Sequence, residues 1–535
     1  MNQYEVLCYT RHPEEDAVYS AKLAYSMHLA VNLGTGNFEP LNHNGGVLYV
    51  KATQNEDGTL NAMSLKNPWL FKDKGDSYGV IAERIEAFGK EDATSIVKLL
   101  YFVSKDLLSY EERPLIELPE EEYVEDAICE YKEELGKYRV SWTNGSGASY
   151  QLTIEALEDI SASTEKQEIQ ALKMDRPQTV IKGAIPRNIL EIPKEIALRL
   201  YHKLTVPVNV ANEVPELVKI SSLEDMKKVK VIARYSDGSS VLKPVDWRLE
   251  EVDFTKAGTY EITGRVHHEH YEFPIAIHRA DPCVARWNGK YYYIATNDAD
   301  GNHTLYIREA DTIPGLVNAP EILLLDTKTY AHIGNLLWAP EFHIIKGKLY
   351  IFHAATPGEF VHEQSHVMML KENGSPMNRE DWTMPQRVIR KDGSMLYDYG
   401  ITLDMTVFEL NDNYYAMWSQ RQFTPVDQGA WLYIAQINPE EPWKLITDPV
   451  LISMPEYGWA NNHTFVDEGP FAIITDQKLF VTFSSAAVDS TYVVGLLSAE
   501  LDADPLNQAH GQNATIPSCH VVPKKANMEQ DIMLT

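Results

Sequence analysis

Residues 280–296 read ADPCVARWNGKYYYIAT, an acid followed by an apolar strand, a polar turn and a strongly aromatic strand. The same order of features returns three times, in residues 339–355, 404–420 and 468–485. The turns of the four copies are 58, 65 and 64 residues apart and begin at Asn288, Lys346, Asn411 and Thr475. A strand repeat of about this length indicates β-propeller blades, each a four-stranded sheet around a central channel.

The rest of the chain is divided by its local pattern. Residues 1–185 hold short apolar and aromatic strands between Gly, Asn and Asp turns, which predicts a mainly β, propeller-like module. Within it, residues 20–32 (SAKLAYSMHLAVN) are expected to form a strand. Residues 186–215 carry prolines and the amphipathic stretch PKEIALRLYHKL, which predicts a linker with a short helix. Residues 216–279 alternate strands around an Asp-Gly turn and resemble small bacterial Ig-like β-sandwich modules.

Charge and cysteine content restrict the partners and the compartment. The chain has 77 acidic and 48 basic residues among 535, a net charge of −29, which disfavours nucleic acid and acidic membranes as partners. The amino-terminal residues lack the pattern of a secretory signal. The four cysteines Cys8, Cys129, Cys283 and Cys519 form no metal-binding or disulfide pattern. We therefore expect a cytoplasmic protein with neither a nucleic-acid nor a membrane partner.

Three of the four repeats carry an acid seven residues before the turn, namely Asp281, Asp404 and Glu468. In the remaining repeat Ala339 takes this position, and Glu341 lies two residues further on, which on a strand is the same face. Equivalent positions of propeller blades lie at similar distances from the channel axis and at similar heights along it. The pattern therefore predicts a ring of acids at one end of the channel.

Carboxylates brought together in this way suit glycoside hydrolysis. One carboxyl group protonates the leaving oxygen, another activates water, and a third adjusts the pKa of the acid. Two alternatives remain open from the spacing alone. Acids at strand starts also cap surface turns, and the same acids could form a cation site, although they lack a metal-loop spacing.

The motifs ADP, WAPE, LDMTVF and DEGP, in this order over about residues 280–500, resemble glycoside hydrolase family 43. The resemblance implies a five-bladed propeller and an inverting, exo-acting enzyme. It also implies that Asp281 is the general base, Asp404 the residue that modulates the pKa of the acid, and Glu468 the general acid. Trp338 is expected to stack on a sugar, with core packing as its alternative. Further candidates for binding sugar hydroxyls are Glu341, Arg421, Asn462 and His463, the last with a purely structural channel histidine as its alternative.

The sequence departs from the family after residue 505. Family members have a fifth blade with a Gly-His-Asn motif, whose histidine commonly coordinates a channel calcium or sodium ion or a water. Residues 506–535 show neither this motif nor a strand pattern. Back-translation of the tail in another frame restores the motif. We therefore interpret the catalytic propeller as residues 280–505, followed by a frameshifted tail that leaves the last blade incomplete. Reduced stability and activity are expected, and no metal or other cofactor is expected to be required.

The resemblance implies an α-L-arabinofuranosidase-like hydrolase acting on oligosaccharides derived from hemicellulose. A β-xylosidase of the same family is the nearest alternative, because the three acids are shared and only the pocket differs. A catalytically impaired propeller that binds glycans is a second alternative. The expected partner is an oligosaccharide that contains arabinose or xylose.

Overall fold

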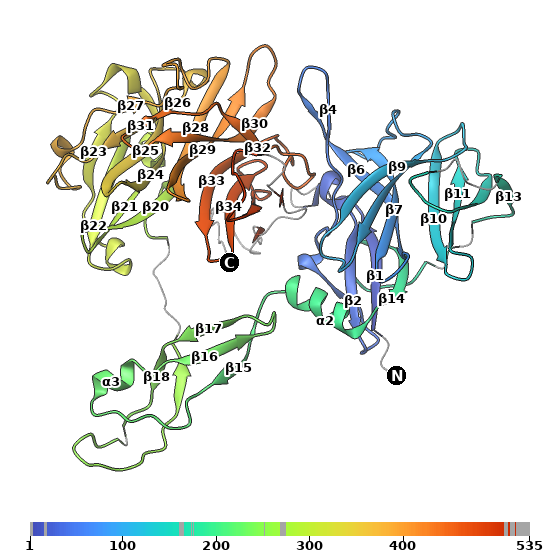
Figure 1. Cartoon of the computed structure of the whole chain (residues 1–535), viewed down its shortest axis with the longest axis horizontal. Helices are drawn as coiled ribbons and strands as arrows, with labels where there is room; N and C mark the ends of the chain where they lie inside the picture. The colour runs from blue at the N-terminus through green and yellow to red at the C-terminus, as the bar shows by residue number, and fades with distance from the viewer. Residues whose placement is uncertain are drawn as a thin grey trace.

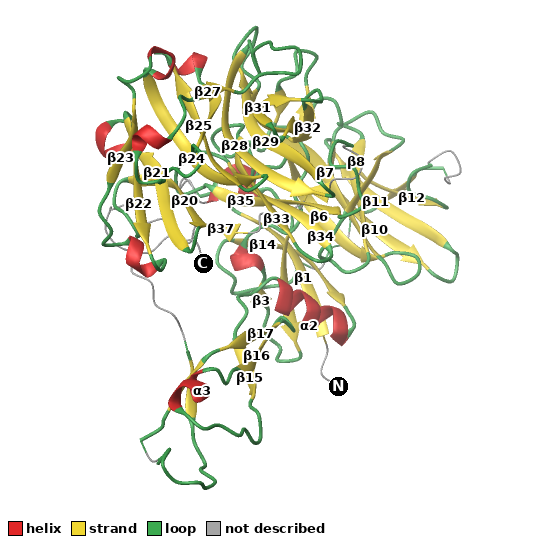
Figure 2. Cartoon of the chain, turned by 60° about the vertical axis from the view of Figure 1, so that its left-hand side comes forward, coloured by secondary structure: helices red, strands yellow, loops and turns green. Residues whose placement is uncertain are grey.

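The chain is mainly β, and its strands gather into three parts (Figure 1). The computed structural model describes residues 4–14, 19–159, 165–172, 174, 176–250, 252–267, 274–507, 512–513 and 519–520. The amino-terminal module and the carboxy-terminal propeller lie side by side, and a small unit lies below them. Figure 2 shows that only a few short helices accompany the strands. None of the helices within the described ranges is long and apolar enough to cross a membrane.

Three four-stranded sheets and one hairpin build the amino-terminal module. The sheets have the strand orders β14-β1-β2-β3, β6-β7-β8-β9 and β10-β11-β12-β13, and β4 pairs with β5. The strands are β1 (Tyr4–Arg11), β2 (His28–Leu33), β3 (Glu39–Pro40), β4 (Thr53–Gln54), β5 (Leu60–Asn61), β6 (Met63–Lys72), β7 (Tyr78–Glu86), β8 (Lys98–Ser104), β9 (Glu111–Glu117), β10 (Val124–Lys132), β11 (Lys137–Asn144), β12 (Ser149–Ile154), β13 (Gln167–Ile169) and β14 (Ala184–Glu191).

Two local features of this module differ from the sequence-based expectation. Residues 20–32 do not form one strand, because the short helix α1 (Ala21–Ala24) precedes β2 and the Ser26 hydroxyl donates to the Leu23 carbonyl between them. Strand β14 pairs with β1 along its length, so residues 184–191 belong to this module's first sheet and not to a linker. Helix α2 (Lys194–Lys203) follows, and its apolar face buries Ala197 and Leu200 against the module core.

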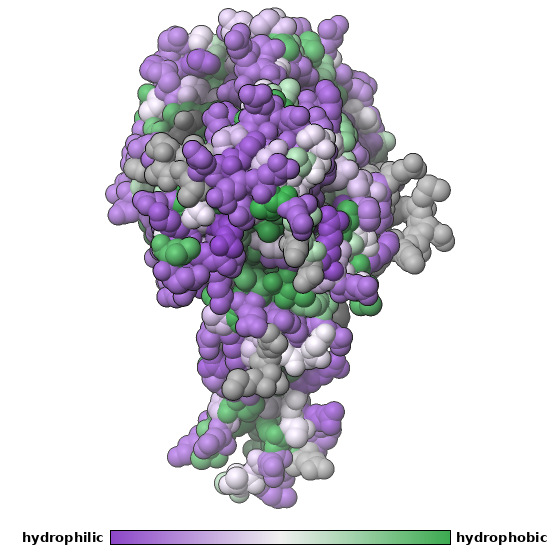
Figure 3. All heavy atoms as spheres, turned by 90° about the vertical axis from the view of Figure 1, so that its right-hand side faces the viewer, coloured by the Kyte–Doolittle hydropathy of each residue, from purple (hydrophilic) through white to green (hydrophobic). Residues whose placement is uncertain are grey.

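The small unit contains two short sheets, with orders β15-β16-β17 and β18-β19. Its elements are β15 (Asn209–Glu213), α3 (Leu223–Lys227), β16 (Val231–Tyr235), β17 (Ser240–Lys243), β18 (Val245–Trp247) and β19 (Gly264–Val266). Strand β15 pairs with β16, so this unit begins before residue 216. The view in Figure 3 shows a largely hydrophilic surface with scattered apolar residues, on the face where this unit projects from the larger body.

Four sheets form the blades of the propeller. The blades consist of β20 (Arg279–Trp287), β21 (Lys290–Asn297), β22 (Thr304–Ala310) and β23 (Ile322–Asp326); β24 (Asn335–Ile345), β25 (Lys348–Thr356), β26 (Gln364–Met369) and β27 (Gln386–Arg387); β28 (Gly400–Leu410), β29 (Asn413–Gln422), β30 (Gly429–Asn438), β31 (Glu441–Leu445) and β32 (Val450–Ser453); and β33 (Asp467–Ile474), β34 (Lys478–Ser485) and β35 (Val493–Glu500). The first strands of successive blades are neighbours, β20 of β24, β24 of β28 and β28 of β33. The sequence-based prediction of propeller blades is confirmed.

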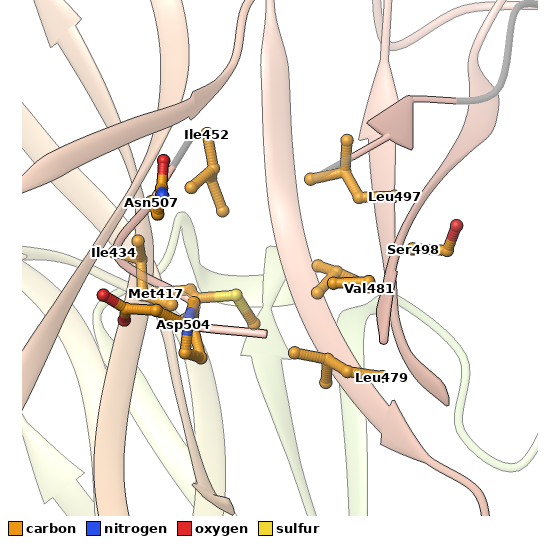
Figure 4. Close-up of a pocket in the computed structure, with 11 residues that line it drawn as sticks. Met417, Ile434, Ile452, Leu479, Val481, Leu497, Ser498, Asp504 and Asn507 are labelled. Atoms are coloured by element: carbon orange, nitrogen blue, oxygen red, sulfur yellow. The ribbon is translucent and has the colours of Figure 1, made fainter. Parts of the chain in front are cut away.

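A small gap lies between the third and fourth blades. Figure 4 shows Met417, Ile434 and Ile452 facing Leu479, Val481 and Leu497 across a pocket of about 60 Å³. This volume is too small for a sugar ring, and most of the lining is apolar, with Ser498, Asp504 and Asn507 as its polar members. We regard the pocket as a packing gap.

The tail after residue 505 contains two short strands among its described residues. Strands β36 (Gln512–Asn513) and β37 (Cys519–His520) both pair with β35. The expectation that residues 506–535 have no strand is therefore wrong at these two places. The remainder of the proposed frameshifted segment, residues 508–511, 514–518 and 521–535, lies outside the described residues.

Candidate active site

Each of the four innermost strands is interrupted by a β-bulge at the same level of the propeller. In β20 the pairing jumps from Ala280 to Cys283, and in β28 it jumps from Leu403 to Thr406. Strands β24 and β33 have equivalent interruptions. The residues at the bulges with positive φ are Asp281 (49°), Ala339 (43°), Asp404 (53°) and Gly469 (58°). Bulges turn side chains away from the regular alternation of a strand and recur beside active sites.

The positions of the bulges correct the sequence-based alignment of Glu468, the acid of the fourth repeat. In the first blade, Trp287 is the last paired residue before the turn. In the fourth blade, Thr475 is the last paired residue before the turn, because its backbone N–H donates to the Lys478 carbonyl. The fourth turn therefore starts at Asp476, one residue later than expected. Gly469, not Glu468, is the equivalent of Asp281 and Asp404. The predicted equal offset of the three acids is wrong by one residue at Glu468.

Four carboxyl groups nevertheless converge on one site. Burial raises the pKa of Asp404 well above its ordinary value, and the negative charges of Glu468, Asp281 and Glu341 raise it further. Burial and the charge of Asp281 also raise the pKa of Glu468. Since these groups act on one another electrostatically, the structure brings Asp281, Glu341, Asp404 and Glu468 together in the channel.

Asp281 is the acid with the best access to water. Its side chain is exposed to solvent although protein surrounds it densely, as expected for a group at the bottom of an open channel. Burial raises its pKa, Asp298 and Glu341 add to the rise, and the Thr296 hydroxyl, which donates at 2.6 Å to Oδ2, lowers it. The same hydroxyl accepts from the Ala339 N–H at 2.8 Å, which fixes its direction. The solvent access favours an ionised Asp281.

Asp404 and Glu468 are less exposed and are held by donors of the fourth blade. The Gly469 N–H donates to Asp404 Oδ2 at 3.0 Å, and the Tyr492 hydroxyl donates to Glu468 Oε1 at 2.7 Å. The bond from Tyr492 and the positive charge of Arg421 both lower the pKa of Glu468, against the rise caused by burial. The environment therefore favours a proton on this pair and an ionised carboxylate at Asp281.

Two buried acids next to this cluster were missed by the sequence-based interpretation. Asp467 is fully buried, and its carboxylate accepts from Ser453 at 2.7 Å and Ser485 at 2.5 Å, while burial raises its pKa to about 7. It immediately precedes Glu468 and fixes the start of β33. The DEGP motif was the only signal for it.

Glu363 is the second buried acid that the sequence-based interpretation missed. Both of its carboxyl oxygens are buried and have no hydrogen-bond partner among the described residues. Burial and the charge of Asp404 raise its pKa to about 10, so Glu363 is protonated at neutral pH. No motif in the sequence marks this residue.

An aromatic row borders the site. Ring centroids of Trp338 and Phe360 are 5.7 Å apart, and those of Phe360 and Phe423 are also 5.7 Å apart. The Arg421 guanidinium lies 5.2 Å from the centre of the Phe423 ring and pairs with Asp427 at 3.1 and 2.6 Å. Because the Arg421 charge reaches Glu468, this row extends along the edge of the acid cluster.

The remaining predicted sugar-binding residues lie in different surroundings. Glu341 is 20% exposed and contacts His343 at 2.9 Å, with its charge directed at the acid cluster. Asn462 is buried, and its side-chain oxygen accepts from Ser20 of the amino-terminal module at 2.7 Å. His463 is 42% exposed and contacts Asp489 at 3.0 Å. The structure thus places Asn462 at a contact between modules and His463 at the surface.

Within the described ranges, no group of three or more His, Cys, Asp or Glu side chains is arranged to hold a metal ion. We therefore derive no step through a channel ion. The expectation that no cofactor is required stays a prediction.

Acidic side chains with distinct environments in a propeller channel define an acid–base hydrolase site. Residues 271–527 match the model of the glycosyl hydrolases family 43, and residues 229–268 match a bacterial Ig-like domain (group 4). The chain belongs to glycoside hydrolase family 43. The Ig-like match falls on the small unit of β15–β19, and the family 43 match continues past residue 505 into the tail.

Several named proteins are similar to this chain. The chain is 31% identical over 244 residues to an extracellular exo-α-(1→5)-L-arabinofuranosidase of Streptomyces avermitilis, covering 46% of this chain and 48% of that protein. It is 28% identical over 248 residues to an enzyme of the same name from Streptomyces chartreusis, covering 46% and 72%. An α-L-arabinofuranosidase structure from Lactobacillus brevis has 31% identity and a TM-score of 0.41, over 46% of this chain and 75% of that one. The chain thus spans about half the length of the first of these relatives.

The expectation of a cytoplasmic protein is wrong, because both Streptomyces relatives are named extracellular. The prediction of a cytoplasmic protein rested in part on the unpaired cysteines, and their burial explains why it failed. Cys8 and Cys129 are buried, and burial raises the pKa of Cys8 and of the partly buried Cys283 to about 12. A thiol that stays protonated is slow to oxidise, so unpaired cysteines do not require a reducing compartment.

Proposed function

We propose that the protein is an inverting, exo-acting α-L-arabinofuranosidase that acts on oligosaccharides derived from hemicellulose. The observation that carries this proposal is the difference in environment between Asp281 and Glu468. Asp281 is exposed to solvent, whereas Glu468 is half-buried, and burial together with the charge of Asp281 favours the protonated form of Glu468. One ionised and one protonated carboxyl group are the two groups that hydrolysis of a glycosidic bond requires.

In the proposed mechanism, Asp281 removes a proton from a water molecule in the open channel while that water attacks the anomeric carbon. Glu468 gives its proton to the glycosidic oxygen, and the bond between this oxygen and the anomeric carbon breaks. The attack from the opposite face inverts the configuration, provided that the two carboxyl groups are about 6.5–9.5 Å apart. Asp404 does not touch the reacting bond in this scheme. The charge of Glu468 raises the pKa of Asp404, so the two carboxyl groups favour holding one proton between them, and this is the proton that the acid delivers.

The choice of arabinofuranose over xylose rests on the relatives, two of which are named exo-α-(1→5)-L-arabinofuranosidases. A β-xylosidase of the same family remains the second candidate because the acids are common to both. The aromatic row of Trp338, Phe360 and Phe423 supplies flat apolar faces for the C–H face of a sugar in either case.

Hydrolysis of aryl α-L-arabinofuranosides and aryl β-D-xylosides by the wild type and by Asp281→Asn tests the proposal. We expect turnover of the arabinofuranoside, and a loss of roughly 10²–10⁴-fold in kcat for the variant at unchanged thermal stability. Preferred turnover of the xyloside would favour the second candidate. Sugar binding without turnover by the wild type would indicate a glycan-binding propeller and contradict the proposal.

A further inference from the structure

The amino-terminal module contacts the two segments of the propeller that lead to the proposed general acid. One is residues 457–466, which run directly into β33 and Glu468. The other is residues 423–428, the connection between β29 and β30 that follows Arg421. In Figure 1 the β4 end of the amino-terminal module lies next to β30.

The first contact is made by α1 and the residue before it. Lys22 is only 8% exposed, and its ammonium donates at 2.5 Å to the Asn461 carbonyl and lies 5.0 Å from the centre of the Phe465 ring. The Ser20 hydroxyl donates to Asn462 Oδ1 at 2.7 Å. Leu23 and Tyr49 pack in the same apolar cluster as residues 457 and 459 of this segment.

The fixed segment continues into the acid without a flexible break. The Phe465 carbonyl accepts from the Ala430 N–H at 2.9 Å, and Val466 forms a parallel bridge to Ala430. Asp467 is then held by two serines, and Glu468 follows. The contacts of Ser20 and Lys22 therefore fix the start of a continuous stretch of chain that ends at Glu468.

The second contact is made by the β4–β5 hairpin and by Lys51, which lies just before it. The Gln428 side-chain amide donates to the Asp57 carbonyl at 2.7 Å. Asp427, one residue earlier, holds the Arg421 guanidinium whose charge acts on Glu468. Lys51 forms an ion pair at 2.7 Å with Glu456, the residue directly before the first segment.

We propose that the amino-terminal module is part of the catalytic unit and positions the general acid, with Lys22 as the principal positioning residue acting through residues 461–466. This inference rests on the proposed function, since it needs Glu468 to be the acid. It assigns to the module a role in the reaction rather than only in stability.

The cost of burying Lys22 supports this role. No carboxylate pairs with Lys22 among the described residues, and burial lowers its pKa to about 8. A buried cation that is held only by a carbonyl and an aromatic face contributes little to stability. Replacement by methionine keeps the apolar length of the side chain and removes the charge. We therefore expect Lys22→Met to fold, and to lose function instead.

The test uses the dependence of the rate on the leaving group. Protonation by the acid matters greatly for a poor leaving group, such as the sugar of a disaccharide, and little for 2,4-dinitrophenol, which departs as an anion. For Lys22→Met in the full chain, we expect kcat/KM on the disaccharide to fall about 10- to 100-fold and on the dinitrophenyl glycoside less than about 3-fold. Lys22→Arg keeps a cationic donor and should recover part of the loss.

Lys137→Met is the matched control, because Lys137 pairs with Glu155 at 2.9 Å elsewhere in the same module. It should behave as the wild type on both substrates. Ser20→Ala tests the neighbouring contact and should show a smaller loss with the same selectivity for the poor leaving group.

Three outcomes separate this inference from the proposed function. An equal loss on both substrates, or no loss on either, overturns the positioning role while the wild-type activity upholds the glycosidase. A wild type that hydrolyses neither substrate overturns the glycosidase, and the positioning role falls with it. A selective loss on the poor leaving group supports both.

Discussion

The Tyr492 hydroxyl, directly before β35, donates a hydrogen bond of 2.7 Å to Oε1 of Glu468 in β33. This bond opposes the effect of burial, because a donor to the carboxylate favours its ionised form and lowers its pKa. The balance between the two sets the pH at which the proposed acid loses its proton.

Removal of this bond in Tyr492→Phe should raise the pKa of Glu468. Activity that requires a protonated acid is lost as the pH rises through this pKa, so the basic limb of the kcat/KM profile should move to higher pH. Tyr414→Phe is the matched control, since Tyr414 donates at 2.7 Å to Glu409 rather than to one of the four acids. A basic limb that stays in place or moves to lower pH in Tyr492→Phe would contradict the assignment of Glu468.

The hydroxyl of Thr296 has the corresponding influence on the proposed base. Thr296→Val removes a bond that lowers the pKa of Asp281, so this pKa should rise. The base is active when ionised and loses activity as the pH falls through its pKa. The acidic limb of the profile should therefore move to higher pH, whereas Thr296→Ser should leave it near its original position. An acidic limb unchanged in Thr296→Val would show that another group is the base.

Asp467 gives a prediction about stability rather than rate. Its folded-state pKa of about 7 lies above the ordinary value of 3.8. The stability that the protonated carboxyl contributes is thus fully present below about pH 3.8 and is lost as the pH rises through about 7. Asp467→Asn stays neutral, so it should raise the melting temperature by roughly a few degrees at pH 8 and change it little at pH 4. Equal shifts at both pH values would contradict the raised pKa.

The aromatic row predicts an effect on substrate binding. Phe360 is 39% exposed and lies between Trp338 and Phe423. Phe360→Ala should raise KM about 10-fold with a smaller change in kcat, because stacking on the sugar is lost while the acids stay in place. Phe88→Ala is the control, since Phe88 is 79% exposed in the amino-terminal module. An unchanged KM in Phe360→Ala would remove this row from the site.

The sequence predicted the propeller because each blade repeats one pattern of strand and tight turn. Asn288 and Gly289 have positive φ at the first turn, as do Lys346 and Gly347 at the second, and such turns leave a clear signal. The same pattern misplaced Glu468 by one residue, because the fourth turn, Asp476 and Gln477, has neither a glycine nor an asparagine to mark its position.

Features that depend on contacts between distant segments were not predictable. Lys22 and Asn461 are 439 positions apart, and neither residue type marks a contact between modules. Glu363 looks like an ordinary loop acid until its burial beside Asp404 is seen. The helical turn of α1 was missed because four residues are too few to show a helical period.

The stereochemistry of the first product tests the central claim most directly. Proton NMR spectra recorded in the first minutes of hydrolysis of an α-L-arabinofuranoside, before the product equilibrates, distinguish the two anomers. The proposed single displacement by water, with Asp281 as base and Glu468 as acid, predicts that the β anomer appears first. Initial formation of the α anomer would require a covalent intermediate and would contradict the mechanism.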